Sequence, residues 1–213
     1  VLGPFARPAD AYISSARGFV IPCGSLERPG EFFEGGVGYQ LAAGNTGPQS
    51  VGDCEGEAEA SAFASQAQGA LRATSSAGGL YASASTAVLE TTVTLFGPTS
   101  AATVTDTFEL IITGTATSPY EGFVTSAWNA CISVFVPSTG ALFHVPTCLL
   151  PTFGNGGPIA QTVTLEFTTP VVGGQVQLIV NSHVGTNSYG TYDDLGDPVF
   201  GGVDLGNTAY IVH

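Results

Sequence analysis

Apolar and polar side chains alternate along much of this chain, and this period of two constrains the fold more than any other feature. In residues 161–167 (QTVTLEF), Val163, Leu165 and Phe167 share one parity, whereas threonines and a glutamate take the other. Residues 89–96, 128–136 and 173–180 repeat the pattern. Because successive side chains of a strand point to opposite faces, each of these segments predicts a half-buried β-strand.

Turn signals separate these segments at intervals of about ten residues, which is typical of sandwiches and barrels. They include GPQS, SAGG, FGPTS, PSTG, GNGGP, VVGG and DLGDP. The sequence therefore predicts an all-β protein, an antiparallel β-sandwich of the jelly-roll or Ig-like kind with about ten strands. We expect residues 23–213 to form this single domain and residues 1–22 to form an extended N-terminal arm.

One segment, residues 56–73, has a composition rich in Ala, Glu and Gln that favours a helix. However, its alanines at positions 58, 60, 62 and 64 alternate strictly with polar residues and Phe63. No apolar stripe with helical spacing is visible. We therefore predict one long strand there.

Charge is scarce and strongly acidic: 10% of residues are charged and the net charge is −13. Nucleic acids and anionic membrane surfaces are excluded as partners, because both require clustered cations. All four basic residues are arginines, so chemistries that need a lysine, such as Schiff-base catalysis, are excluded. No stretch reaches the eighteen or more apolar residues of a membrane span.

The chain begins at Val1 and contains no methionine, which predicts removal of an export signal and an extracellular or cell-surface location. Export agrees with an even number of cysteines that lack zinc or redox spacing. The four cysteines allow three pairings, and the shortest loops join Cys23 to Cys54 and Cys131 to Cys148. The second pair flanks a predicted hairpin with a Pro-Ser-Thr-Gly turn.

Three segments resemble secreted bacterial β-sandwich proteins that often precede a PEP-CTERM sorting tail. They are residues 78–97, the FELIITG strand at 108–114, and the final VDLGNTAYIVH, in which the matching positions are Val203, Asp204, Asn207, Thr208 and Ala209. The resemblance covers residues 55–213 and implies export and a role in the extracellular matrix or at the cell surface. The sequence up to His213 contains no Pro-Glu-Pro motif with an apolar span and basic end, so we expect that such a tail either has been removed or never existed.

An acidic turn near the C-terminus supplies hard carboxylate oxygens, which suit calcium. A solvated turn is the simpler interpretation, and no cofactor is required. The candidate calcium ligands are Asp193, Asp194, Asp197 and Asp204. Two aromatic residues in the adjoining loop, Tyr189 and Tyr192, are candidate glycan contacts.

No catalytic constellation is visible in the sequence. The three histidines are scattered, no GxSxG elbow occurs, and Glu90, Glu109 and Glu166 have the parity expected for the solvent side of their strands. We therefore predict that the protein is not an enzyme.

The N-terminal arm differs in charge from the rest of the chain. Residues 1–30 carry a net charge of +1, whereas residues 31–213 carry −14. The arm therefore predicts noncovalent strand addition between copies, which would build an extracellular filament or surface assembly. Its candidate assembly residues are Phe5, Arg7, Tyr12, Ile13 and Arg17. The alternative is a monomeric carbohydrate-binding or adhesive module.

Overall fold

The computed structural model describes residues 8–21, 39–45, 49–51, 54–65, 69–98, 100, 102–118, 126–138, 141–142, 147–149, 156–206 and 209–212. In residues 8–21, 39–45, 49–51, 54–55, 141–142 and 209–212 only the backbone is described, except that Ala16 is placed and fully buried. Among the residues described, none belongs to a helix long and apolar enough to span a membrane.

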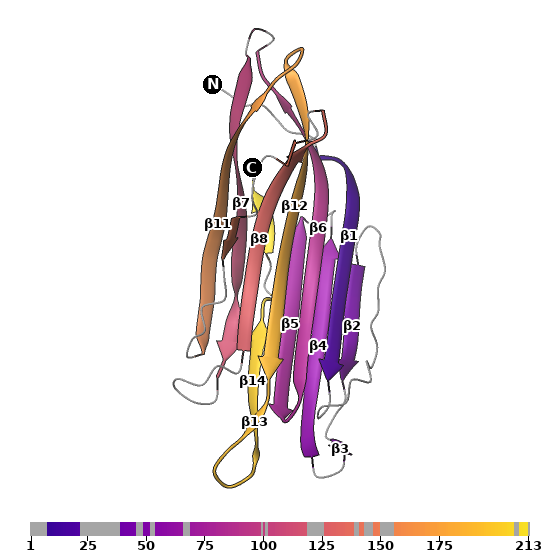
Figure 1. Ribbon diagram of the computed structural model, residues 1–213, viewed down its shortest axis with the longest axis vertical. Helices are drawn as coiled ribbons and strands as arrows, with labels where there is room; N and C mark the ends of the chain where they lie inside the picture. The colour runs from indigo at the N-terminus through magenta and orange to yellow at the C-terminus, as the bar shows by residue number, and fades with distance from the viewer. Residues whose placement is uncertain are drawn as a thin grey trace.

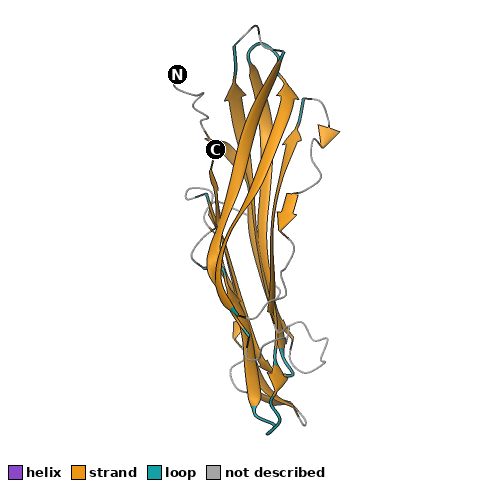
Figure 2. Cartoon of the chain, turned by 90° about the vertical axis from the view of Figure 1, so that its left-hand side faces the viewer, coloured by secondary structure: helices purple, strands orange, loops and turns teal. Residues whose placement is uncertain are grey.

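The molecule is an elongated sandwich of two antiparallel β-sheets (Figures 1 and 2). The predicted all-β antiparallel sandwich is confirmed. Within the described residues, ten strands have seven residues or more and five are shorter. The strands are β1 (Pro8–Ile21), β2 (Tyr39–Asn45), β3 (Gln49–Val51), β4 (Cys54–Ser65), β5 (Ala70–Gly79), β6 (Ala82–Phe96), β7 (Thr103–Thr117), β8 (Ser126–Val136), β9 (Ala141–Leu142), β10 (Thr147–Leu149), β11 (Gly157–Pro170), β12 (Gln175–Tyr189), β13 (Thr191–Tyr192), β14 (Pro198–Asp204) and β15 (Ala209–Val212).

The smaller sheet, here called sheet A, has the order β1-β6-β12-β8-β10, with β9 also paired to β8. The larger sheet, sheet B, has the order β13-β14-β7-β15-β5-β4-β2, with β11 paired to β7 and β3 paired to β4. β1 therefore forms one edge of sheet A, and β11 forms an edge of sheet B. The two strands lie on opposite sides of the sandwich, β11 on the left and β1 on the right of Figure 1.

One part of the core is built from large apolar side chains, as the alternating pattern predicts. Val163, Leu165 and Phe167 of β11 are buried, and their polar neighbours are exposed. The ring of Phe167 stacks on Phe108 of β7, with centroids 5.5 Å apart and planes 8° from parallel. Trp128 and the other apolar residues of its parity in β8 are also buried.

The other part of the core is built from small residues. Ala58 and Ala60 of β4 and Ala77 of β5 form a buried cluster with Tyr81. Nearby, hydroxyl groups from sheet A reach the backbone of sheet B: Ser83 Oγ donates to the carbonyl of Ser76 at 2.8 Å. Small side chains therefore let the two sheets approach closely along β5 and β6.

The segment 56–73 forms two strands, β4 and β5, where the sequence predicted one long strand. The parity of the alanines is confirmed, since Ala58, Ala60, Ala62 and Ala64 are buried. The turn before β5 contains Gly69, whose φ of 59° suits glycine. The alternating pattern continues on both sides of this turn and conceals it.

The C-terminal residues lie in the middle of sheet B. β14 and β15 both insert between β5 and β7: Asp204 is opposite Thr74 and Thr115, and Ala209 is opposite Leu71 and Ile112. β14 and β15 thus lie inside the larger sheet. The two ends of the chain differ, because the N-terminal strand lies at an edge and the C-terminal strands are central.

Candidate functional site

A groove of about 290 Å³ is hollowed into the outer face of sheet B. Four strands contribute to it, and its lining residues are Glu59, Thr74, Ser75, Ser76, Thr115, Thr117, Gly202, Val203 and Asp204. The strand register explains this grouping. Gly202 is opposite Ser76 and Thr117, and Glu59 lies beyond Ser76 on β4.

The groove forms because β14 has little side-chain bulk on its outer face at this point. Val203 points into the core and is buried, while Gly202 has no side chain, and a Cβ atom there would lie within 3.1–3.4 Å of Thr117, Ser75 and Ser76. The hydroxyl of Thr117 turns toward β14 and donates to the carbonyl of Gly202 at 3.3 Å. The result is a floor of backbone and hydroxyl groups with a carboxylate on each side, Glu59 and Asp204.

The carboxylate of Asp204 is held by the chain that follows it. Its Oδ1 accepts a hydrogen bond from the backbone N–H of Gly206 at 2.5 Å. This turn fixes the orientation of the carboxyl group at the end of β14. Both Asp204 and Glu59 are exposed, so both can meet a ligand from solvent.

An aromatic ring lies two residues before Gly202 on the same face of β14. Phe200 is opposite Gly78 of β5, and a Cβ atom at Gly78 would collide with the Phe200 ring. The ring therefore packs directly on the glycine backbone. Its side chain is 43% exposed, so part of the ring is accessible from solvent.

A positive charge lies on β5 at some distance along the same outer face. The Arg72 guanidinium carbon is 5.0 Å from the centroid of the Phe63 ring, a cation–π contact between β5 and β4. Close to the groove the charges are negative, because Glu57 lies opposite Gly78 and Glu59 opposite Ser76. The groove is therefore an acidic, hydroxyl-rich surface next to an aromatic ring.

The four aspartates predicted as calcium ligands are not brought together. Asp193 Oδ1 accepts hydrogen bonds from the N–H groups of Leu195 and Asp197, both at 2.9 Å, so this carboxylate shapes the turn between β13 and β14. Asp194 is exposed in the same turn, and Asp204 lies at the far end of β14. Over the described ranges, no group of three or more His, Cys, Asp or Glu side chains is arranged to hold a metal ion.

The two predicted glycan contacts lie at the same end of the molecule as Phe200. Tyr189 ends β12 and is 56% exposed, while Tyr192 is partly buried in β13. Sequence analysis missed Phe200, because no local pattern marks it. The signal is a long-range pairing with Gly78, which appears only when β14 is placed beside β5.

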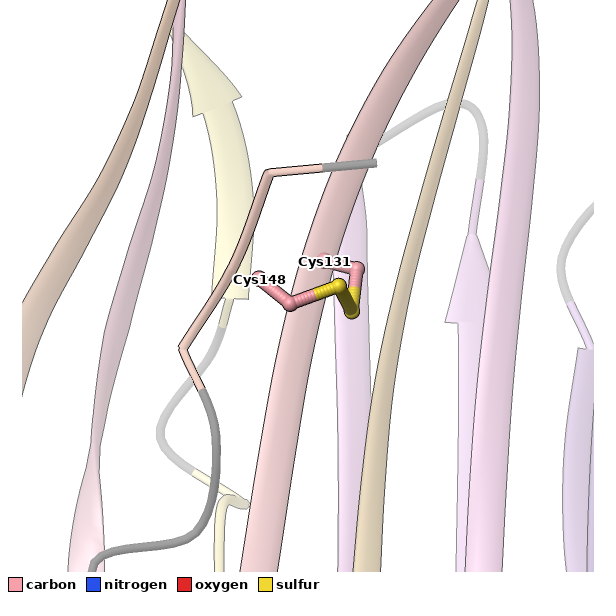
Figure 3. The surroundings of a disulfide bond; sticks show 2 residues. All are labelled: Cys131 and Cys148. Atoms are coloured by element: carbon pink, nitrogen blue, oxygen red, sulfur yellow. A yellow bond between two sulfur atoms is a disulfide. The ribbon is translucent and has the colours of Figure 1, made fainter. Parts of the chain in front are cut away.

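The predicted Cys131–Cys148 disulfide is confirmed. Its sulfur atoms are 2.04 Å apart and its Cα atoms 4.1 Å apart, and the two residues are directly opposite each other on β8 and β10 (Figure 3). The other predicted pair, Cys23–Cys54, is not placed by the structure. Cys23 and the side chain of Cys54 lie outside the described residues.

Most of the predicted assembly arm is the strand β1, which pairs with β6 of its own chain. Arg17 is opposite Thr86, Ile13 is opposite Glu90, and the register shifts between Ala9 and Ile13, a span that includes Tyr12. Phe5 and Arg7 lie outside the described residues, as do the side chains of Tyr12, Ile13 and Arg17. The arm is thus an edge strand of the sandwich.

Comparison with known proteins finds no family model and no curated protein that matches this chain. Two solved structures have low similarity to it. One is the enzymatically active domain of bacteriophage CBA120 tailspike protein 4, with 14% identity over 92% of this chain and 19% of that chain, and a TM-score of 0.22. The other is infectious bursal disease virus, Gx strain, with 10% identity over 97% of this chain and 61% of that chain, and a TM-score of 0.15. TM-scores this low do not establish a shared fold.

Proposed function

We propose that the protein is an extracellular structural subunit that self-assembles noncovalently, through addition of its N-terminal strand to a neighbouring copy. In this assembly β1 stays on β6 of its own chain, and its open edge pairs with the open edge of β11 in the next copy. The observation that carries the proposal is that β11 pairs, among the described strands, with β7 on one side only.

β11 pairs with β7 over fourteen consecutive positions without a bulge, from Gly157 to Pro170. Native proteins usually protect a long edge strand with lysines, prolines, bulges or a short length. β11 has no lysine, its prolines lie only near its ends at Pro158 and Pro170, and Glu166 is its single charged residue. Such an edge presents a row of backbone donors and acceptors to a further strand.

The second strand of the proposed contact, β1, matches β11 in length. β1 is also fourteen residues long and forms the edge of sheet A, on the opposite side of the sandwich from β11. A contact between two different surfaces on opposite sides is heterologous, and it extends without limit unless its rotation closes a ring. The expected product is therefore a filament. The charge of Arg17 in β1 complements the acidic remainder of the chain.

The experiment is electron microscopy and sedimentation of the native protein and of two β11 variants, Gln161→Pro and Thr162→Pro. Adjacent residues of an edge strand direct their N–H groups alternately to the paired strand and to the open edge, and proline removes the N–H. One variant therefore damages the pairing with β7 and lowers Tm. The other blocks only the open edge, so it keeps its Tm and loses filaments.

A third variant, Thr164→Lys with Thr168→Lys, keeps every backbone N–H and adds the charges that usually protect edges. It is also expected to be folded and monomeric. Native protein that remains monomeric at all concentrations would overturn the proposal, as would filaments that persist in the proline variant with unchanged Tm. Deletion of β1 is a poorer test, because it would uncover β6 beside the buried Ala16.

A further inference from the structure

We infer that the outer face of sheet B carries a binding site for an oligosaccharide without negative charge, with Phe200 as the stacking platform and Glu59 and Asp204 as hydrogen-bond acceptors. The site is independent of the edges β1 and β11. It also differs from the tyrosine loop that the sequence indicates.

The first argument is the open ring of Phe200. The ring packs against the backbone of Gly78, and 43% of the side chain remains exposed to solvent. The C–H face of a pyranose ring is apolar and flat enough to pack on such an aromatic surface. An exposed aromatic ring held in one orientation costs little conformational entropy when the ligand binds.

The second argument is the order of groups along β14. Phe200, Gly202 and Asp204 face outward in succession, and four residues of strand span about 13 Å. The groove of about 290 Å³ is lined by Gly202, which lies two residues after Phe200 on the same strand. An oligosaccharide with one ring stacked on Phe200 can thus extend past Gly202, which has no side chain, toward the carboxylates of Glu59 and Asp204.

The third argument is the chemistry of the lining. Carboxylates accept strong hydrogen bonds from sugar hydroxyls, and the hydroxyls of Thr74, Ser76 and Thr115 can donate or accept. Negative charge from Glu57, Glu59 and Asp204 disfavours uronic acids, sulfated sugars and phosphates. The ligand class is therefore a neutral or amino-substituted oligosaccharide.

The site is shallow, so a dissociation constant on the order of 0.1–1 mM is expected for one subunit. Repetition of the site along an assembly would raise the overall avidity without any new contact. For this reason the experiment is done with the monomeric β11 edge variant, so that failure of assembly and failure of sugar binding are distinguishable.

The experiment is titration calorimetry with a panel of neutral, amino-substituted and uronic-acid oligosaccharides at millimolar concentrations. Phe200→Ala is expected to weaken binding at least tenfold, and Gly78→Ala to weaken it similarly by displacing the ring without removing it. Asp204→Asn retains an oxygen for the N–H of Gly206 and tests the charge alone, with an expected loss of about threefold to tenfold.

Two controls keep the result interpretable. Phe200→Tyr retains the ring and should bind normally, and Tyr189→Ala removes an exposed aromatic residue outside the groove and should have no effect. The inference is overturned if calorimetry at millimolar sugar shows no binding of neutral or amino sugars. It is also overturned if binding survives both Phe200→Ala and Gly78→Ala, or if only Tyr189→Ala abolishes it.

Discussion

The hydroxyl oxygens of Ser75 and Ser188 lie 2.8 Å apart and join β5 of sheet B directly to β12 of sheet A. Ser188 Oγ also donates to the carbonyl of Ser75 at 2.9 Å, so the proton between the two hydroxyls comes from Ser75. A similar arrangement links Thr186 to Ser85, which donates to the carbonyl of Thr74. Serine side chains are too short to bridge the usual separation of about 10 Å between packed sheets, so the sheets are closer here.

This close approach predicts that larger residues will not fit between the sheets. Ser188→Val should lower the free energy of unfolding by about 1–3 kcal/mol although valine favours strands, because it overfills the space and removes both hydrogen bonds. Ser188→Ala should cost about 1 kcal/mol through the lost hydrogen bonds. Equilibrium urea unfolding measures both, and Thr164→Val on the exposed face of β11 is the matched control. A Ser188→Val variant as stable as the native protein would show that the gap is wider than described.

The alternating pattern identified the inward residues because the period of a strand is a local property. It did not show that residues 66–69 separate two strands, because the alternation is similar in β4 and β5. The local sign of the break is the change from buried even positions in β4 to buried odd positions such as Ala73 and Ala77 in β5. Strand order is likewise not local. The insertion of β14 and β15 between β5 and β7 depends on pairings between residues 85 to 140 positions apart in the chain.

The candidate site was accessible from sequence only in part. Glu59 belongs to an acidic run that is visible in the sequence, and Asp204 was a candidate ligand, but the two lie on strands separated by β5. Their relation to Phe200 depends on Gly78, a residue with no side chain. The Cys131–Cys148 pair was predictable because its loop is short and its flanking residues alternate.

Removal of the disulfide should destabilise the fold by about 3 kcal/mol, which is the chain-entropy expectation for a short loop. The variant is Cys131→Ala with Cys148→Ala, and the two cysteines are 17 positions apart in sequence. Urea unfolding of the native and variant proteins, both without reductant, measures the difference. A loss well below 1 kcal/mol would mean that the unfolded chain keeps residual structure around this loop even without the disulfide.

The stability should also decrease as the pH is lowered through the range in which histidine titrates. His183 lies on β12 opposite Val88 and Cys131, and burial lowers its pKa from 6.5. The unfolded chain therefore binds a proton near pH 6.5 while the folded chain does not, so the free energy of unfolding falls as the pH drops below that value. The decrease ends once the pH passes the folded pKa.

The measurement is the urea midpoint of the native protein and of His183→Gln at pH 7.5 and pH 5.5. The variant should lose less stability than the native protein over this interval. Glu90 on the neighbouring strand, which accepts a hydrogen bond from Asn181 at 3.5 Å, remains in both proteins. Equal losses in the two proteins would assign the pH dependence to other groups.

The central position of the C-terminal strands can be tested at Gly114 of β7. A Cβ atom there would collide with the main-chain oxygen of Asp204, and a backbone atom inside a sheet cannot move aside as a flexible side chain can. Gly114→Ala should therefore cost about 1–3 kcal/mol of folding stability, although alanine usually stabilises a strand relative to glycine. Gly97→Ala is the matched control, because a Cβ atom at Gly97 has no neighbour within 4 Å. If the two variants were equally stable in urea, β14 would not pack against β7 at this point, and the groove between Glu59 and Asp204 would lose its floor.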